Sequence, residues 1–115
     1  MEQKSKVATF IGFAIRAGTC KMGLNACATL KKANLMLVCC STGKSTVEKA
    51  ISLAKKLNCP VLITKNKLLE SFTHKENSKV MAITDKALAK AILDNAIEDF
   101  SFNIQESIQR YTLFL

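Results

Sequence analysis

Basic, glycine and amide side chains gather in the segment RAGTCKMGLNACATLKK, which runs from Arg16 to Lys32. A turn at Gly18 precedes a few residues that suit a short strand, and a new helix is expected to open at 23–25, Gly-Leu-Asn. A helix N-terminus presents unpaired N–H groups and the positive end of the helix dipole, so it attracts phosphate. The Asn25 amide can donate to and accept from a base edge. The spacing alone favours an ordinary capped helix start, and the residue types also suit a phosphate-binding and base-contacting site.

A second candidate is the run 42–46, Thr-Gly-Lys-Ser-Thr, between an expected strand and an expected helix. A nucleotide-binding P-loop needs a glycine five positions before Gly43, so that the loop can wrap the phosphates. That position is Val38, inside the expected strand. The loop is too short to hold a triphosphate, so we exclude nucleotide hydrolysis. Lys44 stays a candidate contact for a backbone phosphate.

The other reactive side chains form no catalytic or metal-binding pattern. His74 is the sole histidine and lies in a polar stretch beside Lys75. A nucleophile and its base need a third, orienting group, and nothing in the sequence nominates one. The five cysteines include no C-x-x-C spacing, so we interpret them as buried, reduced thiols. We expect no catalysis, no metal and no cofactor. A small-molecule enzyme is a weaker alternative that needs convergent titratable groups in a pocket.

The net charge of +8 is unevenly spread along the 115 residues. Residues 1–79 carry +10 and residues 80–115 carry −2. Such a field favours an anionic partner, and nucleic acid is the first choice, although a lysine-coated surface can also serve solubility alone. No apolar run is long enough to span a bilayer and no cleavable signal layout opens the chain. We therefore expect a cytoplasmic protein with no membrane partner.

Apolar stretches with helical spacing alternate with continuous apolar runs. The expected helices are at about 4–17, 24–32, 45–57, 68–72 and 85–97. The expected strands are at 35–41, 61–64 and 79–84, with a possible short antiparallel strand near 19–22. A capping box, Ser45 to Glu48, is expected to open the third long helix, and Asp85 to cap the last. The alternation predicts an α/β fold, a three-layer α/β/α sandwich with a mixed, mainly parallel four-stranded sheet.

We expect residues 1–97 to form one domain and residues 98–115 to form a C-terminal extension. Ile104, Ile108 and Tyr111 repeat at helical spacing there, before an apolar end, TLFL. An exposed apolar end promotes aggregation. The extension is therefore expected to dock on the body or on a partner, which includes self-association with a second copy.

Several short motifs in fixed order resemble a known family. They are IGFAIRAG (11–18), GLNAC (23–27), LMLVCCS (35–41), AKKLNCPVLI (54–63) and VMAITDKALAKAI (80–92). From about Phe10 to Leu93 the chain resembles the kink-turn RNA-binding superfamily of ribosomal L-seven-Ae and L-thirty-e proteins, in particular its short bacterial members. The resemblance implies a non-catalytic protein that binds structured RNA such as ribosomal RNA, on or near the ribosome.

In that family a helix that starts with Gly-x-Asn-Glu, with a Lys one turn later, reads sheared G·A pairs at a sharp RNA kink. The resemblance puts Gly23 at the family's Gly position and Asn25 at its Asn position. Ala26 and Thr29 stand at the Glu and Lys positions, and they cannot supply the same base-edge contacts. Kink-turn specificity is therefore in question, and Lys31, or the lysine after it, is the candidate to compensate.

In the same family a loop before the last strand packs against a flipped-out base. This loop aligns with residues 72–75, in which a histidine can stack on an unpaired base. In the resulting hypothesis the start of the helix binds phosphates, Asn25 contacts a base and the loop closes over a nucleotide. The expected RNA-binding residues are Arg16, Lys21, Gly23, Leu24, Asn25, Lys31, Phe72, Thr73, His74 and Lys75. The alternative is a protein-interaction subunit that kept the fold and lost specific RNA readout.

Overall fold

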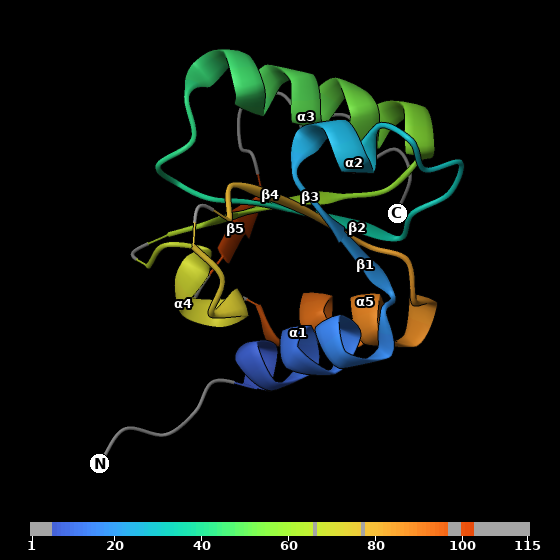
Figure 1. Ribbon diagram of the computed structural model, residues 1–115, viewed down its shortest axis with the longest axis vertical. Coiled ribbons are helices and arrows are strands. Elements are labelled where there is room, and N and C mark those ends of the chain that lie inside the picture. The colour runs from blue at the N-terminus through green and yellow to red at the C-terminus, as the bar shows by residue number, and fades with distance from the viewer. Residues whose placement is uncertain (1–5, 66, 77, 97–99, 103–115) are drawn as a thin grey trace.

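The computed structural model describes residues 6–65, 67–76, 78–96 and 100–102. In this part of the chain, helices and strands alternate into a mixed α/β fold (Figure 1). The helices are α1 (Lys6–Ala17), α2 (Leu24–Cys27), α3 (Lys44–Leu57), α4 (Glu70–Thr73) and α5 (Lys86–Asn95). The strands are β1 (Cys20–Met22), β2 (Leu35–Val38), β3 (Val61–Thr64), β4 (Val80–Ile83) and β5 (Phe100–Phe102).

The strands form one open sheet in the order β1-β4-β2-β3-β5. All four expected strands are present, and β5 extends the sheet beside β3. The short strand β1 pairs antiparallel with β4, as expected for residues 19–22.

The prediction of a mainly parallel sheet is wrong. Only β2 and β3 run parallel among the described pairs, whereas β1–β4, β2–β4 and β3–β5 are antiparallel. A parallel crossover needs a connection long enough to return along the sheet, as α3 does between β2 and β3. Within the described residues, the connection from β3 to β4 contains one helix, α4, whose 4 residues are too few to carry the chain back along the sheet. β4 therefore starts at the end where β3 stops.

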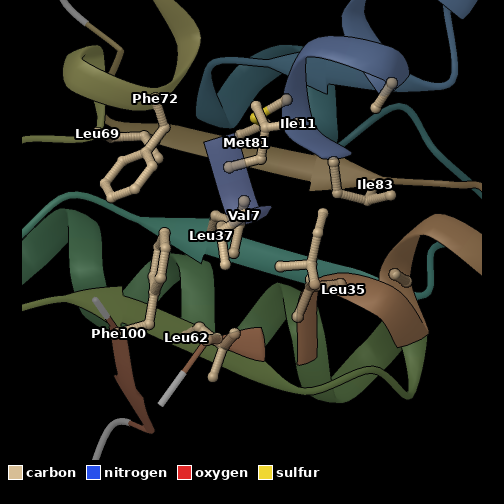
Figure 2. Packing of buried hydrophobic residues seen from close by; sticks show 14 of the residues in the cluster. Val7, Ile11, Leu35, Leu37, Leu62, Leu69, Phe72, Met81, Ile83 and Phe100 are labelled. Carbon is tan, nitrogen blue, oxygen red and sulfur yellow. The ribbon is translucent and has the colours of Figure 1, made fainter. Parts of the chain in front are cut away.

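Helices lie on both faces of the sheet (Figure 1). On one face α1, α4 and α5 cover a cluster that includes Ile11, Leu37 and Phe72 (Figure 2). On the other face α2 and α3 cover a cluster that includes Met36 and Ala50. Strands β2 and β4 are buried at every position because both faces are covered, which explains their continuous apolar sequence.

The helix ends test the local predictions. The Asp85 side chain accepts a hydrogen bond of 3.0 Å from the Leu88 N–H, which confirms Asp85 as the cap of α5. The capping box at Ser45 is wrong, since α3 begins at Lys44 with Gly43 as its N-cap and without a side-chain cap. The second helix is shorter than expected and spans only Leu24–Cys27.

Part of the expected extension lies within the described residues. Phe100 opens β5, is buried, and contacts the core cluster of the α1, α4 and α5 face. The stripe of Ile104, Ile108 and Tyr111 lies outside the described residues, so its docking stays a prediction.

Candidate nucleic-acid interface

The turn between β1 and α2 holds the first group of candidate residues. The Gly23 N–H donates to the Val80 carbonyl at 2.8 Å, which ties the turn to the start of β4. Gly23 has φ +90°, a conformation that side chains disfavour, so glycine is required by the backbone itself. Leu24 is half-buried against the α2–α3 cluster. The start of α2 is therefore held at one end of β4, with its first turn at the surface.

Two polar side chains of this turn are exposed and available to a ligand. Lys21 lies on β1 and Asn25 lies in the first turn of α2. Within the described residues, the Asn25 side chain forms no hydrogen bond. Thr29 is different, because its hydroxyl donates to the Ala26 carbonyl at 2.7 Å just beyond the C-terminal end of α2. That bond and the tight turn after Cys27 account for the shortened helix.

A compact loop after α4 lies beside this turn. The Thr73 hydroxyl is 2.8 Å from the Ser78 hydroxyl and accepts a bond of 3.1 Å from the Lys75 N–H. The Ser78 hydroxyl also donates to the Lys75 carbonyl at 2.7 Å, so these bonds close the loop on itself. The same hydroxyl lies 3.9 Å from the Met22 sulfur, at the end of β1. The loop and the β1–α2 turn are therefore neighbours.

The loop presents His74 and Lys75 to solvent. His74 caps α4 in the left-handed conformation, with φ 59°, and its N–H donates to the Glu70 carbonyl at 2.8 Å. Burial raises the pKa of Cys20 overall, while the charges of Lys75 and Lys21 oppose that rise. Both ammonium groups therefore lie near enough to the Cys20 thiol to act on it.

Phe72 and Thr73 do not face a ligand. Phe72 is 2% exposed and its ring centroid lies 5.1 Å from that of Phe100 inside the core (Figure 2). Thr73 is 5% exposed and its hydroxyl is engaged in closing the loop. The expected stacking on a nucleotide therefore cannot involve these two side chains in this conformation, and both act by holding the loop in place.

Arg16 and Lys31 lie away from the β1–α2 turn and from the loop that presents His74. The chain after Arg16 reaches Thr19, whose carbonyl accepts from the Thr84 N–H at the far end of β4. Lys31 is exposed in the segment that enters β2, where the Asn34 N–H donates to the Ile83 carbonyl at 2.8 Å. The structure therefore brings Lys21, Gly23, Leu24, Asn25, His74 and Lys75 to one end of the sheet and leaves Arg16 and Lys31 at the other.

Lys79 lies at the same end of the sheet as these six residues, although it was not among the residues expected from the sequence. Its carbonyl accepts from the Cys39 N–H at 2.8 Å, and its ammonium donates to the Ser41 hydroxyl at 2.7 Å. It therefore links the start of β4 to the loop that leads into α3 at Gly43 and Lys44. Finding it from sequence would have required the antiparallel pairing of β4 with β2.

The cysteines are all free, and their surroundings differ. Burial raises the pKa of Cys27 to about 11 and that of Cys59 to about 12. Burial also acts on Cys39, but hydrogen bonds from Ser41 and the Leu69 N–H outweigh it and lower the pKa. Cys40 is exposed, contrary to the prediction of uniformly buried thiols.

Within the described residues, no group of three or more His, Cys, Asp or Glu side chains is placed to hold a metal ion. No helix in the same part of the chain combines the length and apolar character that crossing a bilayer requires.

The chain is similar in fold to a solved protein of unknown function from Bacillus halodurans. The two share 18% sequence identity with a TM-score of 0.70, over 79% of this chain and 96% of the other. At that identity the similarity establishes the fold alone. No protein-family model and no curated protein matches the chain.

Proposed function

We propose that this chain is a non-catalytic, cytoplasmic RNA-binding protein of the kink-turn superfamily, ribosomal or ribosome-associated, with a three-layer α/β/α sandwich as its scaffold. The observation that carries the proposal is that the Gly23 turn lies next to the loop that presents His74 and Lys75. The Gly23–Val80 hydrogen bond and the Ser78–Met22 contact join them. An exposed amide, an imidazole and two ammonium groups then share one surface, which suits a backbone kink with an unstacked base.

The proposed roles follow from exposure and chemistry. Lys21 and Lys75 bind backbone phosphates, since a lysine ammonium is a point charge that needs no fixed base geometry. Asn25 donates to and accepts from a base edge, because its amide is exposed and has no hydrogen-bonding partner among the described residues. His74 stacks on an unpaired base at the tip of the loop. Phe72 and Thr73 support the loop from below.

The test is binding to a short RNA with a kink-turn beside a plain hairpin of equal length, at two salt concentrations. Preference for the kink-turn at both salts supports specific readout, and Asn25→Ala is expected to reduce it by about 1–3 kcal/mol. Lys21→Ala is expected to weaken both RNAs alike and to lower the salt slope by about one unit. Lys56→Ala, an exposed lysine of α3, is the matched control.

Equal losses on both RNAs for Asn25→Ala would remove the base-reading role. Equal, salt-sensitive binding of wild-type protein to both RNAs would leave only the general attraction of charge.

A specific observation favours the alternative, a protein-interaction subunit that kept the fold and lost RNA readout. Ala26 and Thr29 stand where the superfamily uses Glu and Lys, and the Thr29 hydroxyl is engaged with the Ala26 carbonyl. Under this alternative the apolar residues beyond 102 contact a partner. Deleting 103–115 would then abolish association in light scattering and leave the thermal unfolding of the body unchanged.

A further inference from the structure

The outer face of α1 carries an aromatic and cationic pair that the proposed interface does not use. Val7, Ala8, Ile11 and Ala14 are buried in the core, whereas Phe13 and Arg16 lie on the exposed side of α1. Phe13 is 43% exposed, and Arg16, one turn later, is exposed too. The carbon at the centre of the Arg16 guanidinium lies 5.1 Å from the centroid of the Phe13 ring.

This arrangement differs from an isolated exposed apolar residue, which needs no explanation. The ring of Phe10 meets Phe13 edge-on, with centroids 6.4 Å apart. A Cβ added at Gly12 would lie 3.8 Å from an Arg16 terminal nitrogen, so the guanidinium lies along the helix surface. The ring and the guanidinium are therefore held together in advance, and less entropy is lost when a ligand orders them.

The charge of α1 itself favours an anionic ligand. The α1 sequence, KVATFIGFAIRA, contains no acidic residue, and Arg16 forms no salt bridge among the described residues. A guanidinium stacked on a ring keeps its N–H edges free to bind phosphate oxygens. A flat ring beside such a donor is the chemistry that binds single-stranded nucleic acid, in which bases stack on aromatic side chains and phosphates meet arginine.

We propose that the Phe13–Arg16 pair on α1 is a second RNA contact, which binds an unpaired nucleotide flanking the structured element. This inference rests on the proposed RNA-binding function. The base stacks on Phe13, and Arg16 binds the adjacent phosphate. The helix α1 packs against α4, whose C-cap is His74, so both contacts belong to the same helical layer of the molecule. Arg16 lies at the opposite end of the sheet from His74, so a single-stranded flank that leaves the first interface reaches the Phe13–Arg16 pair by running along this layer.

The experiment compares two RNAs, the same kink-turn with and without a single-stranded flank of six adenosines. Wild-type protein is expected to bind the flanked RNA more tightly. Phe13→Ala is expected to weaken the flanked RNA about tenfold, the size of one stacked base, and to leave the unflanked RNA unchanged. Arg16→Lys keeps the charge but not the planar stack, and is expected to lose most of the same gain.

Leu68→Ala is the matched control, because Leu68 is a similarly exposed large hydrophobic, at 42%. Thermal unfolding of every variant checks that the fold is retained. If wild-type protein binds both RNAs equally and Phe13→Ala changes neither, the second contact is refuted and the proposed function stands. If wild-type protein binds neither RNA, both the second contact and the proposed function are refuted. If Phe13→Ala alters the oligomeric state and not RNA affinity, the face is a protein contact, which also overturns the inference.

Discussion

Replacing Phe72 separates a core role from an RNA-contacting role. The side chain is 2% exposed and its ring packs against Phe100, which lies on β5. Removing a buried Phe side chain costs about 3–5 kcal/mol, of which the ring pair itself contributes about 0.5–1.5 kcal/mol. For a domain of this size, each 1 kcal/mol lowers Tm by about 4–8 °C. We therefore expect Phe72→Ala to lower Tm by at least about 12 °C.

The same substitution at Phe13 is the control, since it removes the same atoms from a side chain that is 43% exposed. It loses the contacts with Arg16 and with the Phe10 ring and much less burial than Phe72, so we expect a cost of about 1 kcal/mol. Urea unfolding followed by far-UV circular dichroism measures both free energies of unfolding. Equal destabilisation by the two variants would refute the placement of Phe72 in the core.

The milder variant Phe72→Leu tests the binding role directly. Leucine keeps most of the apolar volume but has no ring to stack on a base, and the expected cost is about 1–2 kcal/mol of stability. We expect its affinity for the kink-turn RNA to equal that of wild-type protein. A loss of affinity with the fold intact would return Phe72 to the interface.

Three further predictions follow from local geometry. Gly23→Ala is expected to lower the free energy of unfolding by about 1–3 kcal/mol, because Gly23 has φ +90°. Gly43→Ala is expected to lower it little, because Gly43 has φ −65°. Urea unfolding of the two variants measures the difference. Asp85→Ala removes the side-chain cap of α5 and is expected to cost about 1 kcal/mol in the same assay, and no change would refute the cap. Burial raises the pKa of Cys27 to about 11 and that of Cys59 to about 12, so as pH rises both thiols ionise in the unfolded chain before they ionise in the folded protein. The free energy of unfolding is therefore expected to fall above pH 9, by about 1.4 kcal/mol per pH unit for each thiol. The fall ends at the folded pKa of each thiol. Alanine at both positions is expected to flatten the pH dependence of Tm, and an unchanged slope would refute that origin.

The parts of the fold that depend on neighbouring residues were predictable from the sequence. Asp85 caps α5 because its carboxylate reaches an N–H only three residues ahead. The runs that form β2 and β4 are apolar at every position because helices cover both faces of the sheet, and that pattern is legible without a structure. The start of α2 at Gly23 was predictable for the same reason, since its geometry and its residue type are local.

Apart from two local predictions that failed, the capping box at Ser45 and the length of the second helix, the predictions that failed depend on contacts between distant segments. The direction of β4 follows from where the short α4 connection ends in space, and no local pattern encodes it. The burial of Phe72 depends on Phe100, which lies 28 positions later and belongs to a segment expected to be an extension. Lys79 entered the candidate interface only through its bonds to Cys39 and Ser41, across the pairing of β4 with β2.

The groups that build the candidate interface differ from the groups that would touch RNA. Backbone and buried hydroxyl groups hold the interface in place, through the Gly23–Val80 hydrogen bond and the bonds that Ser78 makes. The side chains that face solvent, such as Asn25 and His74, contribute little to that framework. Substitution at exposed positions can therefore change or abolish the proposed RNA contacts without disturbing the fold. Because the framework groups and the solvent-facing groups are different, two proteins can share this fold at 18% identity and differ at the exposed positions. Binding measurements on variants of the exposed side chains therefore decide the function, whereas similarity of fold does not.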